Sequence, residues 1–172
     1  MMNVYKSGKS ELTLIIPALA VVLGDQLSKW WILETFALHE TEVVIPGLFN
    51  LTFVMNSGAA FGLFAGDLTF GRQFFFIAVA ITALVVLFFA YRHLKSQGRI
   101  YVIAIGLIAG GAIGNLIDRI RFGAVIDFFV FYINQYHWPA FNIADSAICI
   151  GAGLLLLGNF FISHPGENQN KK

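Results

Sequence analysis

The sequence predicts an all-α integral membrane protein with four transmembrane helices, a small β-rich extracytoplasmic loop and both termini in the cytoplasm. Of its 172 residues, 58% are hydrophobic and only 12% are charged, and the mean hydropathy is +0.74. Soluble domains are nearer half apolar and a quarter charged. The length suits a single membrane domain over 1–172 and leaves little for a separate soluble domain.

The first apolar run predicts a retained transmembrane helix over about 12–33. Lys6 and Lys9 precede it, and Ala18-Leu19-Ala20 is similar to a cleavage site, so a cleaved signal peptide is the alternative. The apolar pattern nevertheless continues past Ala20 to Trp30-Trp31, as expected of a helix whose tryptophans lie at the far membrane interface.

Two charged residues in this helix, Asp25 and Lys29, lie four positions apart with the acid first. This is the better order for an intrahelical ion pair, which lowers the free-energy cost of both charges near a membrane boundary. The pair either only neutralises itself, or supports an active site or contacts a substrate. The sequence leaves these alternatives open.

An outer loop is expected over 34–71. Pro46-Gly47 is a turn signal, and 48–55 is rich in aromatic and β-branched residues, which favours a strand paired in a hairpin with 43–45. A small-residue segment follows over 56–62. Because the loop is apolar but does not span, we expect it on the membrane surface. There it either holds an extended peptide through strand hydrogen bonds or serves as a structural plug.

Three more apolar runs predict the remaining transmembrane helices and a second outer loop. The helices are expected over about 72–91, 100–120 and 142–161, and the loop over 121–141. Gly106, Gly110 and Gly114 repeat every four residues in the third helix, a pattern that lets transmembrane helices approach closely.

The distribution of charge predicts the orientation. Lysine and arginine gather on one side of a four-helix arrangement, namely at Lys6, Lys9, Arg92, Lys95, Arg99, Lys171 and Lys172. Acidic residues prevail in the first outer loop. By the positive-inside rule the basic side is cytoplasmic, so both termini are cytoplasmic and both long loops face outward. The polar ends of helices one, three and four then meet at the outer face.

A cluster of polar residues lies between apolar segments over 110–146. Its members are Asn115, Asp118, Arg119, Asp127, Asn142 and Asp145. Ionisable groups at membrane depth cost several kcal/mol unless they are paired or hydrated, so their presence indicates function. Any one of them would also be explained by polar contacts at a helix end, but that explanation weakens for the set.

Asp127 and Asp145 are the candidate catalytic pair. Burial in apolar surroundings favours the protonated form of Asp127. Asp145 comes three residues after Asn142, a good N-cap residue, and a helix N-terminus favours negative charge. Two close carboxylates share a proton, so one activates water while the other donates a hydrogen bond to a carbonyl. We predict Asp145 as the base, and Asp118 is the chief rival for a place in the pair.

Other chemistries are not supported. The four histidines fall on both sides of the membrane without ligand spacing, which argues against zinc. Ser57 and Ser146 have no histidine or lysine placed as a base. There is no basic patch for nucleic acid and no phosphate-binding glycine loop.

The alternative function is a small proton-coupled transporter or channel with Asp and Asn ligands. Against it, the acids cluster at one face of the membrane and the sequence shows no inverted repeat. A non-catalytic membrane scaffold would leave the polar segments unexplained.

Five segments match a known motif set in order and spacing. They are 25–29 (DQLSK), 56–61 (NSGAAF), 114–119 (GNLIDR), 125–128 (VIDF) and 141–145 (FNIAD). Together they resemble bacterial lipoprotein signal peptidase, also called signal peptidase II. The resemblance covers the chain from the first helix to the start of the fourth.

The resemblance implies an aspartic endopeptidase of the bacterial inner (cytoplasmic) membrane, with no cofactor or metal and with its active site at the outer face. It would remove signal peptides from prolipoproteins just before the diacylglyceryl-cysteine, contact membrane lipid and be inhibited by globomycin-type antibiotics. No nucleic acid partner is implied, and we expect a monomer. Asp127 and Asp145 match the catalytic pair. Substrate-binding or supporting positions match Asn56, Gly58, Asn115, Asp118, Arg119, Asn142, Asp25 and Lys29.

Overall fold

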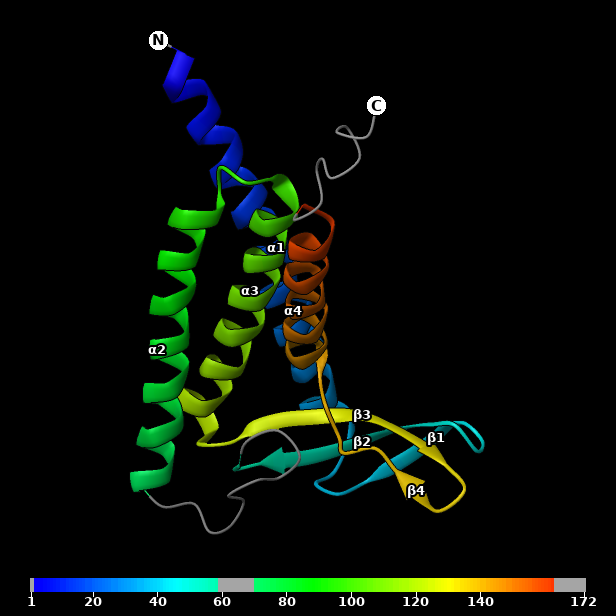
Figure 1. The fold of residues 1–172 in the computed structure, drawn as a ribbon. Coiled ribbons are helices and arrows are strands. Elements are labelled where there is room, and N and C mark those ends of the chain that lie inside the picture. Colours follow the sequence, from blue (N-terminus) through cyan, green and yellow to red (C-terminus); the bar gives the residue numbers. More distant parts are fainter. Residues whose placement is uncertain (1, 59–69, 163–172) are drawn as a thin grey trace, which may run out of the picture.

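The computed structural model describes residues 2–58 and 70–162 (Figure 1). Within these ranges the chain forms four helices and four strands. In order they are α1 (Met2–Thr35), β1 (Thr41–Ile45), β2 (Phe49–Asn56), α2 (Phe70–Leu94), α3 (Arg99–Phe122), β3 (Val125–Ile133), β4 (Tyr136–His137) and α4 (Ile143–Ile162). The helices stand side by side, and the sheet lies across one end of them (Figure 1).

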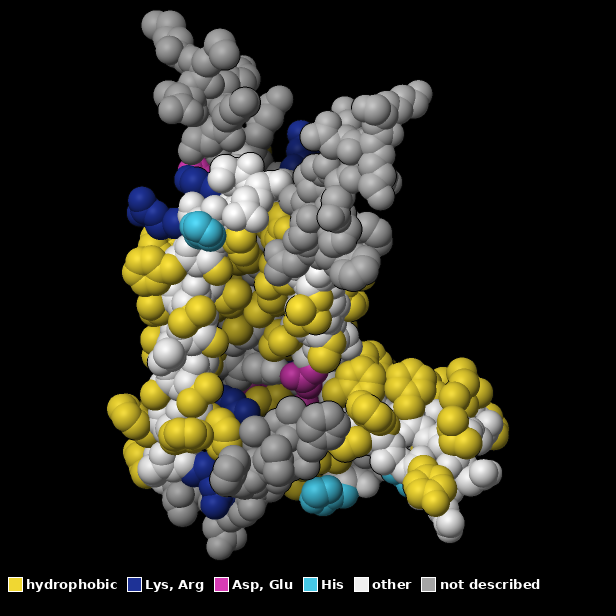
Figure 2. All heavy atoms as spheres, in the orientation of Figure 1, with side chains coloured by type: hydrophobic (Ala, Val, Ile, Leu, Met, Phe, Trp, Pro, Cys, Tyr) yellow, Lys and Arg dark blue, Asp and Glu magenta, His cyan; other side chains and the backbone are white. Residues whose placement is uncertain are grey.

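The helices are apolar and long. Within the described residues, three are long and apolar enough to cross a membrane, over Ser10–Thr35, Phe70–Leu94 and Arg99–Phe122, and Ile143–Gly158 is a shorter apolar helix. Hydrophobic side chains cover their outer surface between the two ends (Figure 2). Helix α1 begins well before the predicted residue 12, because the polar N-terminal segment continues the same helix. The other helix ends differ from expectation by one to three residues.

Helix α3 packs closely against α1 and α4 through its glycines. A Cβ atom at Gly106 would lie 2.6 Å from the Leu14 carbonyl oxygen of α1, and one at Gly110 would lie 2.6 Å from that of Ala18. A Cβ atom at Gly111 would overlap the Ala144 carbonyl oxygen of α4. The predicted small-residue face is therefore confirmed. The close approach brings the polar ends of three helices together.

The strands form one antiparallel sheet in the order β1-β2-β3-β4. The hairpin expected between 43–45 and 48–55 is confirmed, with Val43 opposite Asn50. The second outer loop, expected over 121–141, contains the strands β3 and β4, which the sequence analysis did not predict. Strand β3 is nearly all apolar and aromatic without alternation, since both of its faces are partly covered near the helices.

The position of β2 limits how a peptide can bind. One edge of β2 pairs with β3. The other edge pairs with β1 over Phe49–Thr52, and Phe53 exchanges backbone hydrogen bonds with His39 and Glu40. An extended peptide therefore cannot add to Phe49–Phe53 as a new strand, and on β2 the prediction of strand addition is restricted to Val54–Asn56. The rest of the predicted binding loop, 59–62, lies outside the described residues.

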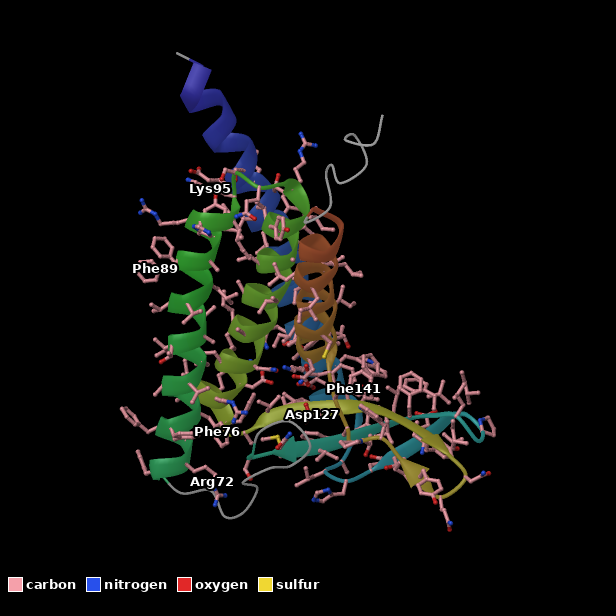
Figure 3. The ribbon with its side chains drawn as sticks, in the orientation of Figure 1. Arg72, Phe76, Phe89, Lys95, Asp127 and Phe141 are labelled. Atoms are coloured by element: carbon pink, nitrogen blue, oxygen red, sulfur yellow. The ribbon has the colours of Figure 1, made fainter. Side chains whose placement is uncertain are left out.

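An apolar cluster fixes the sheet to the helices. It consists of Ile32 and Phe36 from α1 and the segment after it, Phe53 from β2, and Ile126 and Phe128 from β3, all buried. Ile126 and Phe128 flank Asp127 on the same strand. Their burial therefore places the intervening carboxyl group at the junction between sheet and helices, where Figure 3 shows it labelled.

Candidate active site

Two carboxyl groups from different elements meet at this junction through one asparagine. Asp127 lies on β3, and Asp145 lies in the first turn of α4. The Asn142 side-chain amide donates to Asp127 Oδ1 at 2.8 Å, and its backbone N–H donates to Asp145 Oδ2 at 3.2 Å. Acidic side chains are visible at this level, where the helices meet the sheet (Figure 2).

The start of α4 explains how Asp145 is held. Asn142 Oδ1 accepts a hydrogen bond from the Asp145 N–H at 2.9 Å, while Asp145 Oδ2 accepts from the Asn142 N–H. This is a reciprocal cap of the helix N-terminus, and it confirms the predicted N-cap role of Asn142. The helix dipole also favours a negative charge at this position.

Asp127 has different surroundings. Only 2% of the residue is exposed, and its second oxygen accepts from the Asn56 side-chain amide at 3.0 Å. Burial, and then the negative charge of Asp145, raise the pKa of the Asp127 carboxyl to about 7, and the bonds from Asn56 and Asn142 reduce the rise. Near neutral pH this group therefore keeps a proton that ordinary aspartic acid has lost.

Asn115 connects α3 to the pair. Its side-chain amide donates to Asp145 Oδ1 at 2.8 Å, and its carbonyl oxygen accepts from the Lys29 ammonium at 3.0 Å. Both oxygens of Asp145 thus accept hydrogen bonds from N–H donors, an arrangement that suits the ionised form.

Arg119 lies one helical turn further along α3. Its Nη2 donates to the Gly58 carbonyl oxygen at 2.9 Å, and its guanidinium lies over the Phe76 ring of α2 at 4.4 Å from the centroid. Gly58 in turn donates its N–H to Asn56 Oδ1 at 2.9 Å. Arg119 Nη1 is buried without a hydrogen-bond partner among the described residues.

The ion pair predicted between Asp25 and Lys29 is confirmed, at 2.8 Å. Lys29 also pairs with Asp118 at 2.7 Å, which the sequence did not indicate. All three side chains are almost completely buried. The pair therefore does not merely neutralise itself, because it joins α1 to α3 beside the carboxyl groups.

Every candidate site residue belongs to one hydrogen-bonded network, which we call the junction network. Its members are Asp25, Lys29, Asn56, Gly58, Asn115, Asp118, Arg119, Asp127, Asn142 and Asp145. Sequence reasoning missed Gln26, which belongs to this network, and the α2 contacts of Arg119, namely the Phe76 ring and the Gln73 amide, which donates to the Arg119 carbonyl oxygen at 3.0 Å. Gln26 donates to Asp118 Oδ1 at 3.0 Å, and its place between Asp25 and Lys29 was the available signal. Phe76 lies in an unbroken apolar run that carried no signal.

The chemistry available here is that of acids, amides and one guanidinium. Across residues 2–58 and 70–162, no three His, Cys, Asp or Glu side chains are grouped to hold a metal ion. A protonated carboxyl group beside an ionised one suits acid–base hydrolysis of a carbonyl compound. Fold and site together define a membrane protein with the functional groups of a hydrolase.

Comparisons with known proteins agree with this class. The family model described as signal peptidase (SPase) II matches residues 17–161. The chain therefore belongs to the signal peptidase II family, and it is an aspartic protease.

Relatives and solved structures match over most of their length. Lipoprotein signal peptidases of Syntrophotalea carbinolica and Yersinia enterocolitica are 48% and 46% identical, over 86% and 90% of this chain and 90% of each relative. A bacterial membrane enzyme structure superposes with a TM-score of 0.78 at 33% identity, covering 96% of this chain and 95% of the other. A second such structure gives 0.71 at 36% identity, covering 87% and 91%.

Proposed function

We propose that this protein removes the signal peptide from diacylglyceryl-modified prolipoproteins by water attack, with Asp127 and Asp145 as the catalytic pair. The observation that carries the assignment is the bridge through Asn142, which hydrogen-bonds to one oxygen of each carboxyl group. Family membership supports the reaction. The local geometry supports the choice of residues.

The surroundings of the two acids support different roles for them in this proposal. Asp127, with its pKa raised to about 7 by burial and by Asp145, holds the proton. Asp145 lies at a helix N-terminus, and both of its carboxylate oxygens accept hydrogen bonds from N–H groups. Asp145 is therefore the base. This agrees with the roles expected from the sequence.

The reaction then follows in two steps. Asp145 accepts a proton from water as the water oxygen attacks the scissile carbonyl carbon, and Asp127 donates its proton to the carbonyl oxygen. When the resulting diol collapses, the C–N bond breaks, the proton on Asp145 passes to the leaving amine and Asp127 regains a proton from the diol. Both carboxyl groups return to their starting forms.

Asp118 is a poor rival for this pair. Its Oδ2 contacts the Lys29 ammonium at 2.7 Å and accepts the Ile126 N–H at 3.2 Å, and its Oδ1 accepts from Gln26. Asp118 is as buried as Asp127, so these contacts distinguish the two: Asp118 is paired with an ammonium, whereas Asp127 accepts from the neutral amides of Asn56 and Asn142. We assign Asp118 a supporting role.

The proposed orientation places four spanning helices in the inner membrane with both termini in the cytoplasm. The start of α1 and the end of α4 lie at the end of the helices opposite the sheet (Figure 1). Exposed Arg92 and Lys95 lie at that same end, and Figure 3 labels Lys95 there and Asp127 at the other. The positive-inside rule then puts the pair at the outer face.

This placement suits the proposed substrate, since a signal peptide is an apolar helix whose cleavage site reaches the outer interface from within the bilayer. The scissile bond must become extended to be cut, and the acyl chains can lie against lipid-facing helices, contributing binding energy. Partners in this proposal are the modified prolipoprotein, membrane lipid and globomycin-type inhibitors. We propose that the protein acts as a monomer.

The test is cleavage of a diacylglyceryl-modified prolipoprotein by purified protein in detergent. Asp127→Asn and Asp145→Asn are expected to be inactive while remaining folded, because Asn is nearly isosteric and cannot transfer the proton. Asp118→Asn is expected to lose less than about tenfold, since an amide oxygen can still accept from Lys29 and Ile126. An active Asp127→Asn or Asp145→Asn would overturn the pair, and an inactive Asp118→Asn beside an active Asp127→Asn would indicate Asp118 with Asp145 instead. No cleavage by the wild type would favour a transporter.

A further inference from the structure

The buried ammonium of Lys29 occupies the centre of the junction network. Only 1% of the residue is exposed, and the ammonium contacts Asp25 Oδ2 at 2.8 Å, Asp118 Oδ2 at 2.7 Å and Asn115 Oδ1 at 3.0 Å. A lysine ammonium has three hydrogens and no acceptor, so these three contacts satisfy it completely.

Each acid that Lys29 holds also holds the backbone next to one member of the proposed pair. Asp25 Oδ1 accepts the N–H of Ala144, the residue before Asp145, at 3.0 Å. Asp118 Oδ2 accepts the N–H of Ile126, the residue before Asp127, at 3.2 Å. One ammonium thus fixes two carboxylates, and each of these fixes the backbone beside one catalytic carboxyl group.

The third contact is one of two that determine the orientation of the Asn115 amide. Because the ammonium only donates, Asn115 must turn its carbonyl oxygen toward Lys29, and its NH₂ group then faces Asp145 Oδ1 at 2.8 Å. The opposite amide orientation would place an acceptor against the base and a donor against the ammonium. Asn115 Oδ1 also accepts from the Asn142 side-chain amide at 3.2 Å. Lys29 and Asn142 therefore together select the hydrogen bond that Asp145 receives.

Stability alone is a weak reason for this arrangement. A buried group of one lysine and two aspartates contributes little net free energy of folding, because the desolvation of each charge offsets the attraction between them. Apolar side chains of similar volume would join α1 to α3 as well. They would not bind the Ala144 and Ile126 N–H groups.

We propose that Lys29 is a positioning residue that sets the spacing of the Asp127 and Asp145 carboxyl groups and the orientation of the Asn115 amide. The proposal rests on the function proposed above. Lys29 does not touch the substrate; it acts through Asp25, Asp118 and Asn115. It is a role in turnover, distinct from a role in holding the helices together.

Charge supplies an independent readout. The charged groups facing Asp127 are Asp145 from α4, Lys29 from α1 and Arg119 from α3, and Asn56 from β2 is neutral. The positive charge of Lys29 lowers the pKa of Asp127. Removing that charge must raise this pKa further, so the alkaline limb of the pH–rate profile must move to higher pH.

The experiment compares Lys29→Gln and Lys29→Arg with Lys95→Gln, a matched control at the far end of the helices. For Lys29→Gln we expect kcat per folded molecule to fall about 100-fold with KM nearly unchanged, as for a small misplacement of reacting groups, and the alkaline limb to move upward. Lys29→Arg keeps the charge, so its alkaline limb stays in place and its kcat is intermediate. Lys95→Gln matches the wild type.

A triple variant keeps the proposal testable if Lys29→Gln does not fold. In Asp25→Asn/Lys29→Met/Asp118→Asn the three charges are removed together, so no buried charge is left unpaired. Its melting temperature and its binding of an uncleavable lipopeptide should remain near wild type while kcat stays low. Wild-type kcat per folded molecule in this variant, or an activity loss in Lys29→Gln that follows only the folded fraction with an unmoved limb, would overturn the positioning role.

Failure of this proposal and failure of the catalytic pair are distinguishable. If Asp127→Asn cleaves substrate, the pair is wrong whatever Lys29 does. If Asp127→Asn and Asp145→Asn are inactive while the triple variant turns over normally, the pair stands and the positioning role of Lys29 is excluded.

Discussion

The two sides of α3 differ in how they contact their neighbours. Toward α1 and α4, α3 presents glycines, and the backbones approach so closely that an added Cβ atom at Gly110 would lie 2.6 Å from the Ala18 carbonyl oxygen. Toward α2 the contacts are made by side chains: Phe76, the buried residue of that helix, meets the Arg119 guanidinium, and the Gln73 amide donates to the Arg119 carbonyl oxygen at 3.0 Å. The polar network lies on the first side.

This difference has a physical reason. In a bilayer, lipid tails are as apolar as leucine side chains, so helices associate through close packing and hydrogen bonds. The glycine side supplies both and holds Asp145 against Asn115. The α2 side supplies little packing, so α2 affects the site mainly where Phe76 meets Arg119. The comparison predicts that substitutions on the two sides have very different effects.

The largest effect is expected from Gly111→Leu. Its Cβ atom alone would overlap the Ala144 carbonyl oxygen and lie 2.7 Å from Ile148 Cγ1, so α4 would have to move away from α3. Since Ala144 precedes Asp145, we expect loss of cleavage by more than about 100-fold and a lower melting temperature.

Gly153→Leu on α4 is the matched control, because nothing lies within 4 Å of a Cβ atom built there. It adds the same apolar side chain and should leave both the cleavage activity and the melting temperature near wild type. Equal damage from the two substitutions would show that extra bulk on these helices, rather than the α3–α4 contact, is harmful.

The second largest effect is on the pH dependence of cleavage, which also depends on the side of α3 that faces α1 and α4. Asp127 must hold its proton to donate it, and burial with the neighbouring Asp145 raises its pKa to about 7. We expect kcat/KM to fall about tenfold per pH unit above this value. A pH–rate profile that stays flat up to pH 9 would contradict the role of Asp127 as the proton donor. The pKa read from this profile is a property of the Asp127–Asp145 pair and not of one residue alone.

The sequence predicted most of the polar side of this comparison. Charged and amide residues stand out against an apolar chain, and the Gly106-Gly110-Gly114 spacing indicates the contact face of α3. The reciprocal cap at Asn142 and Asp145 follows from local spacing. Such features depend on residues close in sequence, so spacing alone reveals them.

The remaining features depend on contacts between distant segments. Strand β3 was missed because both of its faces are partly covered near the helices, which removes the alternation that indicates a strand. The Lys29–Asp118 contact joins two helices whose relative rotation the sequence does not fix. Phe76 is one of three consecutive phenylalanines, and only the fold shows which one meets Arg119.

A smaller effect is expected from Phe76→Ala on the α2 side. The Arg119 guanidinium lies 4.4 Å from the ring centroid, and a cation–π contact of this kind contributes about 0.5–2 kcal/mol. Its loss should let Arg119 move relative to Gly58, lowering kcat/KM about five- to tenfold with little change in melting temperature. If the melting temperature falls as much as in Gly111→Leu, the two sides of α3 are structurally equivalent and the comparison fails.

The smallest effect is expected from Phe89→Ala, the same substitution near the other end of the same helix (Figure 3). Phe89 is 64% exposed. Among the described aromatic residues its ring contacts only the ring of its neighbour Phe88, with 5.5 Å between the ring centroids. Lipid can replace such a side chain, so kcat/KM measured beside Phe76→Ala should stay within about twofold of wild type. If Phe89→Ala lowers kcat/KM as much as Phe76→Ala, α2 acts on the site as a whole helix. If it does not, the influence of α2 is confined to its end beside Arg119.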